Sequence, residues 1–249
     1  MFELANREGQ KVPQVNFKTR VGADWVERNS DDIFAGKTVI VFSLPGAFTP
    51  TCSSTHVPRY NELADVFKAN GVDDIYCVSV NDAFVMNEWK QSQEAENIGF
   101  LPDGCGHFTK GMGLLVDRDD LGFGVRSWRY SMLVKDGVVE KMFIEPQEPG
   151  DPFHVSDADT MLEYVAPGVA APMDVVVLSR PGCGHCARAK AQLHEHGIDF
   201  DELELLKDYP HRALRALSGG DTYPQIFIDG HHIGGADELD SFLQKSNAA

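Results

Sequence analysis

The chain has 249 residues, of which 43% are hydrophobic and 24% are charged, a composition typical of an ordinary soluble globular protein. Its net charge of −16 is shared by both halves, and an acidic surface of this kind repels phosphate backbones. We therefore expect no nucleic acid among its partners. No apolar run reaches the roughly 18 residues that span a membrane, and no secretory signal is recognisable, so we expect no membrane association. Five cysteines without framework-like spacing favour reactive thiols in a reducing compartment, which predicts a cytoplasmic location.

The beginning of the chain alternates apolar and polar residues from 12 to 20, with a turn near Gly22. We expect an edge hairpin and loop there, and assign it no chemistry. The continuous apolar, β-branched run 38–44 predicts a buried strand. A helical alternation follows over 53–70, and Pro58 inside it is expected to kink the helix.

Cys52 falls in the first turn of this predicted helix, a position that favours a reactive thiol. Unpaired backbone N–H groups and the positive end of the helix dipole stabilise a thiolate there, and the thiolate is the nucleophile. Thr49 offers a hydroxyl that can donate to the sulfur or to its target, while Pro45 and Pro50 stiffen the loop. The alternative is a buried structural cysteine, the ordinary expectation for an isolated Cys. Because these residues agree on one chemistry, we favour the catalytic interpretation.

The octet Pro45-Gly-Ala-Phe-Thr-Pro-Thr-Cys52 resembles the P-x-x-x-T-x-x-C signature of the peroxiredoxins, a family of thiol peroxidases. Its continuation to His56-Val-Pro58 is most similar to the type II branch. The likeness extends through Cys77–Asp82 and Arg129–Val134, and so covers about the first two-thirds of the chain.

The resemblance implies that Cys52 is the peroxidatic residue, which attacks the O–O bond of a peroxide and becomes a sulfenic acid. Negative charge then develops on the leaving oxygen, so the site needs a fixed donor aimed at it. Arg129 matches the arginine that the family supplies, and Arg126, three residues earlier, is the alternative.

Strands and helices alternate along the rest of the first part, which predicts an α/β layered fold. The turn Asp136-Gly137 is the strongest hairpin signal, and 102–113 is expected to be a short Gly-rich loop. The expected strands are 73–80, 114–117, 130–134 and 138–144; the expected helices are 83–97, capped by Asn81-Asp82, and a segment that starts in 156–159 and ends near 165.

Residues 166–172 interrupt this alternation with small residues and two prolines, as expected of a semi-rigid linker. We therefore expect a first domain of residues 1–165 and a second of residues 173–249. The second part has the order β-α-β-α-β-β-α of a thioredoxin-like topology, over strands 174–179, 200–205, 225–228 and 232–233 and helices 187–196, 209–217 and 236–245. With the peroxiredoxin resemblance, the expected fold is α/β with two thioredoxin-like domains.

Cys183 and Cys186 form a C-x-x-C motif at the first strand-to-helix junction of the second part, where this topology carries its redox site. The helix start should lower the pKa of Cys183, and Cys186 lies one turn on, within disulfide reach. A zinc half-site is the competing interpretation, but it needs two more ligands at similar spacing, and only scattered histidines such as His231 and His232 are available. We therefore expect no metal.

Thr222-Tyr-Pro224 and Gly234-Gly-Ala-Asp237 resemble two elements of the glutaredoxins, in which the proline is cis and both elements hold glutathione. The resemblance implies that the helix start and the Asp bind the γ-glutamyl charges. It assigns glutathione to Arg180, Thr222, Tyr223, Pro224, Gly235, Ala236 and Asp237. Gly184-His185 departs from the commonest Pro-aromatic pair between the cysteines, which leaves open an iron–sulfur cluster ligated by glutathione.

The whole chain thus resembles the hybrid peroxiredoxin–glutaredoxin enzymes of bacteria. This implies a glutathione-dependent peroxidase for hydrogen peroxide and alkyl hydroperoxides, with glutathione as co-substrate and no tightly bound cofactor. Two routes can reduce the oxidised Cys52: glutathione followed by the Cys183/Cys186 domain, or Cys77 within the same domain. Cys77 lies in an apolar strand, where an inert thiol is the ordinary expectation, and Cys105 is expected to be incidental. Tethering favours the first route.

Two other functions are compatible with the same motifs. One is a general glutathione-disulfide reductase, or deglutathionylase, and the other is a redox-sensing module that binds an iron–sulfur cluster. The expected partners are peroxides and glutathione, regenerated by glutathione reductase. We also expect a homo-oligomer, a dimer or a tetramer.

Overall fold

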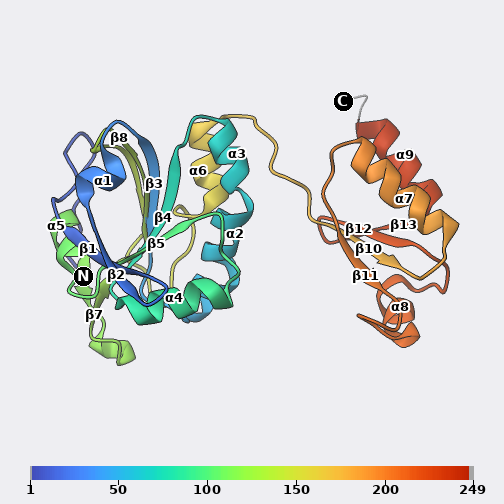
Figure 1. Cartoon of the computed structure of the whole chain (residues 1–249), viewed down its shortest axis with the longest axis horizontal. Coiled ribbons are helices and arrows are strands. Elements are labelled where there is room, and N and C mark those ends of the chain that lie inside the picture. Colours follow the sequence, from blue (N-terminus) through green and yellow to red (C-terminus); the bar gives the residue numbers. More distant parts are fainter. Residues whose placement is uncertain (1, 247–249) are drawn as a thin grey trace. The chain divides into compact units, whose positions relative to one another are not determined.

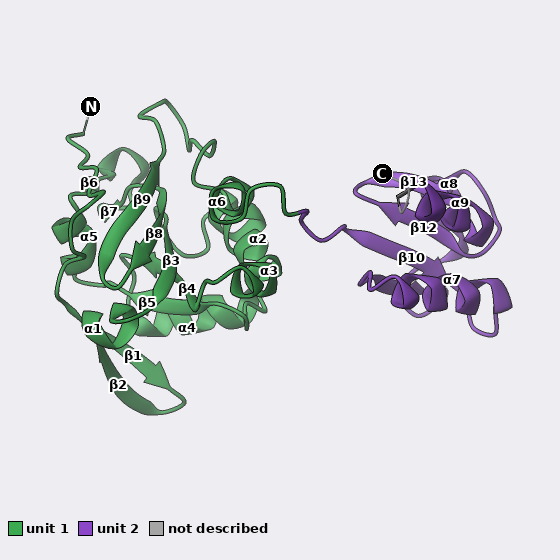
Figure 2. Ribbon diagram, turned by 90° about the horizontal axis from the view of Figure 1, so that it is seen from above, with its two compact units in different colours: residues 1–169 green, residues 170–249 purple. Residues whose placement is uncertain are grey.

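The chain divides into two compact units in the computed structural model, which describes residues 2–246. Unit 1 comprises residues 1–169 and unit 2 residues 170–249 (Figure 2). The division falls inside the segment 166–172 that the sequence indicates as a linker. Met1 and 247–249, the outer ends of the two expected domains, lie outside the described residues.

Unit 1 is built on a five-stranded mixed sheet with the order β5-β4-β3-β8-β9. β3, β4 and β5 run parallel, whereas β8 and β9 are antiparallel to their neighbours. The strands are β3 (Thr38–Ser43), β4 (Asp74–Ser79), β5 (Gly99–Pro102), β8 (Tyr130–Lys135) and β9 (Val138–Ile144). Two smaller antiparallel pairs are β1 (Asn16–Val21) with β2 (Asp24–Asn29), the expected hairpin, and β6 (Leu115–Asp117) with β7 (Val125–Ser127).

Helices cover both faces of this sheet (Figure 1). The residues of β3 alternate between the faces, so Val39 and Val41 join the core beneath α1 and α5, while Phe42 stacks on Tyr60 of α2. The helices are α1 (Ser30–Phe34), α2 (Val57–Glu62), α3 (Ala64–Ala69), α4 (Ala83–Ser92), α5 (His107–Met112) and α6 (Ala158–Val165), with a short 3₁₀ helix η2 (Asp119–Leu121). Figures 1 and 2 both show α2, α3 and α6 on the face opposite to α1 and α5.

The helix expected over 53–70 is instead three consecutive pieces. A π-helix, η1 (Cys52–His56), comes first, followed by α2 and α3, with Leu63 between them at ψ near 0°. Pro58 has no N–H to give to the carbonyl four residues earlier, and at the preceding residue the Val57 N–H bonds the Cys52 carbonyl, five residues back. The proline thus coincides with a wider turn, which replaces the simple kink that we expected.

The prediction of a Gly-rich loop over 102–113 was also wrong, because this segment contains α5. Two of the glycines flank this helix, where Gly106 and Gly113 take left-handed φ values, and Asp103 accepts hydrogen bonds from the Phe108 and Thr109 N–H groups. The sequence analysis likewise missed α1, β5 and β7, and it extended α4 five residues beyond its end at Ser92.

Unit 2 has a four-stranded sheet with the order β11-β10-β12-β13, in which only the β10–β11 pair is parallel. One face packs on α7 and α9 through Val177, Leu193 and Leu239, and the other packs on α8 through Leu178 and Leu214. The elements are β10 (Val175–Ser179), α7 (Gly184–Glu195), β11 (Asp201–Glu204), α8 (His211–Ser218), β12 (Gln225–Ile228), β13 (His231–Gly234) and α9 (Ala236–Ser246). This order confirms the thioredoxin-like topology expected for the second part.

Candidate functional site

Cys52 lies where β3 has given way, through a tight loop, to η1, and its side chain is fully buried. The loop from Pro45 is fixed by hydrogen bonds: the Ala47 N–H donates to Asn81 Oδ1 at 3.0 Å, and the Thr49 hydroxyl donates to the Gly46 carbonyl at 2.8 Å. Since that hydroxyl has one proton, it is committed as a donor and offers its lone pairs to an incoming O–H group. This differs from the donor role that the sequence suggested for Thr49.

Arg129, the residue directly before β8, reaches the cysteine from the sheet. Its Nη1 lies 3.5 Å from Cys52 Sγ and 3.2 Å from His56 Nδ1, and its Nη2 lies 2.6 Å from each carboxylate oxygen of Asp151. The side chain is only 2% exposed. Burial alone would lower the pKa of Arg129, but the charges of Cys52 and Asp151 outweigh it and the pKa is raised, so the guanidinium stays charged.

Arg126, the alternative that the sequence offered, takes a different position. Its Nη1 donates to the carbonyls of Val80 and Val125 at 3.1 and 3.3 Å. The structure therefore brings Arg129 to the sulfur and uses Arg126 to hold neighbouring backbone.

His56 is a neutral partner of Arg129 that the sequence analysis quoted but did not assign a role. Its Nε2 lies 3.1 Å from the Ser156 carbonyl, which only accepts, so Nε2 carries the proton and Nδ1 accepts from Arg129. Burial, and then the positive charge of Arg129, hold the pKa of His56 well below its usual range. The ring thus orients the guanidinium without adding a charge.

A buried carboxylate, Glu145, shapes the loop that supplies Asp151 and Ser156. It accepts the N–H groups of His154, Val155 and Ser156 at 2.8 to 3.0 Å and the Ser156 hydroxyl at 2.7 Å. Burial alone would raise the pKa of Glu145, but these hydrogen bonds outweigh it and the pKa is lowered. No sequence motif marked Glu145 or Asp151.

Cys77, the possible resolving thiol, lies on β4 directly opposite Phe42 of β3, and so on the same sheet face as α2. It is fully buried, and burial, followed by the charge of Cys52, holds the pKa of the Cys77 thiol well above its usual range. A neutral buried thiol is a poor nucleophile, so attack by Cys77 requires local rearrangement. Cys105 is exposed in the loop before α5.

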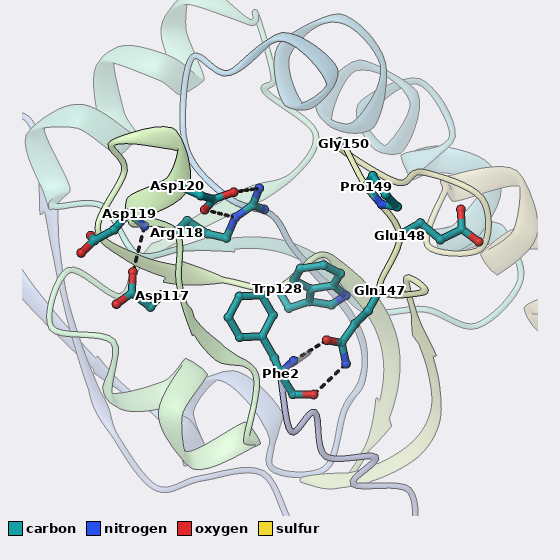
Figure 3. A pocket seen from close by; sticks show the side chains of 10 residues that line it. All are labelled: Phe2, Asp117, Arg118, Asp119, Asp120, Trp128, Gln147, Glu148, Pro149 and Gly150. Atoms are coloured by element: carbon teal, nitrogen blue, oxygen red, sulfur yellow. Dashed lines mark hydrogen bonds and ion pairs between the residues drawn. The ribbon is translucent and has the colours of Figure 1, made fainter.

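A cavity of about 500 Å³ elsewhere in unit 1 lies beside Trp128 (Figure 3). The ring of Phe2 packs on Trp128, and the Gln147 side chain bonds both backbone groups of Phe2. The cavity is lined by Phe2, Asp117, Arg118, Asp119, Asp120, Trp128, Gln147, Glu148, Pro149 and Gly150. It includes no cysteine and does not belong to the Cys52 site.

In unit 2, Cys183 is the N-cap of α7 and is bonded to Cys186 as a disulfide. Its Sγ accepts the Cys186 N–H at 3.1 Å, as a helix start permits. Cys186 is 2% exposed whereas Cys183 is only partly covered, so Cys183 is the cysteine that an external thiol or disulfide can reach. Cys183 also lies 3.8 Å from the carbonyl of Tyr223, whose bond to Pro224 is cis.

A cavity of about 530 Å³ opens beside Cys183, and it brings together every residue that the glutaredoxin resemblance assigned to glutathione. Those seven residues are Arg180, Thr222, Tyr223, Pro224, Gly235, Ala236 and Asp237. The cavity also contains Arg188 and Glu238, which the sequence analysis did not select. Among the described residues, no group of three or more His, Cys, Asp or Glu side chains could hold a metal ion.

The geometry defines a class of protein. Each unit places a cysteine at the first strand-to-helix junction of a thioredoxin-like sheet, one beside a buried guanidinium and one in a C-x-x-C pair. This is the architecture of a thiol oxidoreductase with two redox sites.

Comparisons with known proteins identify the family. The Redoxin family model matches residues 7–162, and the Glutaredoxin family model matches residues 175–233. The chain therefore belongs to the peroxiredoxins, in the hybrid form in which a glutaredoxin domain follows the peroxiredoxin domain. It is a peroxidase, and the fold and family expected from the sequence are confirmed.

Three relatives illustrate the match. The hybrid peroxiredoxin hyPrx5 of Haemophilus influenzae is 61% identical over 96% of this chain and 100% of its own length. Peroxiredoxin sll1621 of Synechocystis is 54% identical, over 68% of this chain and 98% of its own. The crystal structure of reduced Prx3 of Vibrio vulnificus in complex with H₂O₂ is 43% identical and covers 65% of this chain and 99% of that one, with a TM-score of 0.61. No helix within the described residues is long and apolar enough to cross a membrane.

Proposed function

We propose that this peroxidase is glutathione-dependent, that it reduces hydrogen peroxide and alkyl hydroperoxides through Cys52, and that its own Cys183/Cys186 domain regenerates Cys52. The observation that carries the proposal is the cavity beside Cys183. One chain holds a thiol facing a fixed cation, and also a second redox cysteine in a cavity lined by charged side chains and a helix start, which suit a γ-glutamyl tripeptide. The relative crystallised with H₂O₂ supports a small peroxide as one substrate.

In the first half-reaction, the Cys52 thiolate attacks the terminal oxygen of the peroxide, an S–O bond forms and the O–O bond breaks. Cys52 becomes a sulfenic acid, and the leaving oxygen takes the negative charge and then a proton, giving water or an alcohol. Arg129 Nη1 lies 3.5 Å from the sulfur, close enough to stabilise both the thiolate and the charge that develops beside it. The lone pairs of Thr49 can accept the peroxide O–H group.

In the second half-reaction, glutathione attacks the sulfenic acid, releases water and leaves a mixed disulfide on Cys52. The Cys183 thiolate attacks the glutathione sulfur of this disulfide, which frees the Cys52 thiolate. Either Cys186 then expels glutathione and forms the disulfide that the structure contains, which two glutathione molecules reduce back to the dithiol while becoming glutathione disulfide. Or a second glutathione attacks the glutathione sulfur on Cys183 and leaves as glutathione disulfide. Glutathione is thus a co-substrate, and we propose no tightly bound cofactor.

The experiment is peroxide consumption by the full chain with glutathione, glutathione reductase and NADPH, followed at 340 nm. We expect turnover without any added glutaredoxin, its loss in Cys52→Ser, and a decrease of at least tenfold in Cys183→Ser. Full activity of Cys183→Ser combined with loss in Cys77→Ser would assign the resolving step to Cys77 and overturn the proposal. The expected cytoplasmic location and homo-oligomeric state stay predictions.

A further inference from the structure

The cavity beside Cys183 contains more charge than the glutathione site expected from the sequence. Arg188, on the second turn of α7, and Glu238, on the first turn of α9, both line it. Each contacts a group that would otherwise bind the γ-glutamyl end of glutathione: Glu238 contacts the Gly235 N–H, and Arg188 contacts the Asp237 carboxylate. The inference below rests on the proposed function, because it concerns how that site binds glutathione.

Glu238 accepts a hydrogen bond from a backbone N–H at the start of α9. Its Oε2 accepts the Gly235 N–H at 2.8 Å. This N–H is one that a helix start offers to a carboxylate, such as the α-carboxylate of a γ-glutamyl group. In the described structure, the position of a ligand carboxylate is therefore taken by a carboxylate of the chain itself.

Gly234 makes room for this arrangement. A Cβ atom on Gly234 would lie 2.8 Å from Glu238 Cγ and 3.0 Å from Glu238 Cβ, closer than carbon atoms approach. The backbone there has φ +123°, which residues with a side chain rarely adopt. Because Gly234 has no side chain, Glu238 can fold over the end of β13. The local backbone therefore permits its contact with Gly235.

Arg188 pairs with the acidic side chain of the same site, Asp237. Its Nη2 forms an ion pair with Asp237 Oδ1, and its Nη1 lies 4.0 Å from Asp240. Asp237 is the residue that would meet the γ-glutamyl ammonium group. A guanidinium of the chain therefore stands where the ligand cation would stand.

We propose that Glu238 and Arg188 together form an internal mimic of the γ-glutamyl zwitterion, one carboxylate and one cation, which glutathione must displace to bind beside Cys183. The exchange replaces two internal contacts with two ligand contacts of the same kind, so it yields less affinity than an empty site would. The two residues thereby set the KM for glutathione and ease the release of glutathione disulfide. They are affinity-setting residues and take no part in the thiol chemistry.

A simpler interpretation is that Glu238 only caps the helix, since a Glu three residues after the N-cap is half of a capping box. The two interpretations differ in what happens to glutathione when the contact is removed. A pure cap predicts lower stability and an unchanged KM. The internal mimic predicts a lower KM.

The test uses the full chain and the reduction of the mixed disulfide between glutathione and 2-mercaptoethanol, with glutathione, glutathione reductase and NADPH. For Glu238→Ala we expect the KM for glutathione to fall by roughly threefold to tenfold, as for loss of one charge-assisted hydrogen bond at an exposed site, with kcat within about twofold. Glu238→Gln keeps an acceptor for the Gly235 N–H and should give a smaller decrease. Arg188→Ala should lower the KM by about twofold to fivefold, since its pair with Asp237 is largely exposed.

Two controls separate this effect from general changes in charge. Glu195→Gln removes a negative charge at the far end of α7, outside the cavity, and should leave the KM unchanged. Cysteinylglycine, which lacks the γ-glutamyl group, should be used as reductant with equal KM by wild type and both alanine variants, its disulfide being detected directly by chromatography.

An unchanged KM for glutathione in both alanine variants would overturn the inference, as would a raised KM in Arg188→Ala, which would make Arg188 a direct ligand. These outcomes are distinct from failure of the proposed function. If glutathione does not support turnover by the wild type at all, the glutathione dependence itself is wrong.

Discussion

Arg129 contacts three groups of different chemistry through one planar guanidinium, and these contacts fix its position. Nη1 donates to the Cys52 sulfur and to His56, while Nη2 donates to the Asp151 carboxylate. Lysine keeps the charge but has a single nitrogen, which cannot reach all three groups at once. The positive charge alone is thus insufficient to restore the site.

We expect Arg129→Lys to lower kcat/KM for hydrogen peroxide by about 10²- to 10³-fold, the loss typical of removing one well-placed donor to a developing negative charge. Stopped-flow measurement of peroxide consumption under single turnover isolates this step from regeneration. Arg126→Lys is the matched control, because Arg126 donates to the backbone carbonyls of Val80 and Val125, and it should change the rate by less than tenfold. A larger effect at Arg126 than at Arg129 would contradict the assignment.

His56 gives unit 1 a pH-dependent stability. Its pKa is held below the ordinary 6.5, so below pH 6.5 the unfolded chain binds a proton that the folded chain rejects. Stability therefore falls as the pH is lowered through 6.5, by up to about 1.4 kcal/mol per pH unit. Between pH 7.5 and 5.0 this single group therefore makes the folded protein progressively less stable relative to the unfolded chain.

The measurement is the free energy of unfolding from urea titrations at pH 7.5 and 5.0. We expect His56→Gln to be less stable than wild type at pH 7.5 and to show a smaller difference between the two pH values. An equal pH dependence in both proteins would show that His56 is not the group responsible. Glu145 does not interfere, because its lowered pKa keeps its own contribution intact until the pH falls below about 4.5.

At the scale of elements, the buried carboxylate of Glu145 holds the loop 146–157 in the conformation that the site requires. Glu145 directly follows β9 and accepts three successive N–H groups from the far end of this loop, which fixes both the Ser156 carbonyl on His56 and the Asp151 carboxylate on Arg129. Phe153 of the same loop packs against His56, with ring centroids 4.9 Å apart. One residue therefore positions two partners of Arg129.

Glu145→Gln keeps the size of the side chain but turns one acceptor oxygen into an NH₂ group that faces N–H donors. We expect it to destabilise the protein by about 2–3 kcal/mol, the cost of leaving a buried donor without a partner, and to lower kcat/KM for peroxide at least tenfold. Urea unfolding and single-turnover peroxide consumption check the two effects. Loss of stability with an unchanged kcat/KM would show that the loop is not needed to orient Arg129.

How far the sequence predicts this site depends on how local the determinants are. Cys52, Cys183 and Cys186 were identifiable because a strand-to-helix junction and its cysteine lie within a few residues of one another. Asp151 and Glu145 were not, because they reach the site through long-range hydrogen bonds that leave no periodic signal. At the level of elements, α5 was missed for a different reason, which is local: glycines stand before it, within it and after it, and its capping carboxylate, Asp103, precedes Gly104.

At the scale of the whole molecule, the sequence predicted the two-part organisation because each part is itself a complete strand and helix alternation. The five-stranded sheet of unit 1 was less predictable. β5 is four residues long and contains both Gly99 and Pro102, so neither its length nor its composition marks a strand. It forms because it pairs in parallel with β4, a contact between segments far apart in the sequence.

The last prediction concerns the tether itself. If the domain that contains Cys183 regenerates Cys52, the linker supplies it at an effective concentration on the order of millimolar. A protease site inserted within 166–172 allows the two units to be separated after purification without changing either site. At micromolar enzyme, we expect cleavage to lower the rate of glutathione-driven peroxide consumption by at least tenfold, under conditions where regeneration limits turnover.

The dependence on enzyme concentration distinguishes tethering from simple damage. The intact protein should give a rate proportional to its concentration, whereas the cleaved mixture should approach a rate proportional to the square, because two separate molecules must meet. Single-turnover oxidation of Cys52 should be the same before and after cleavage, since every partner of Arg129 named above lies in unit 1. A cleaved protein with an unchanged rate at every concentration would mean that free glutathione or Cys77 regenerates the peroxidatic thiol, and that the fused domain serves other disulfides.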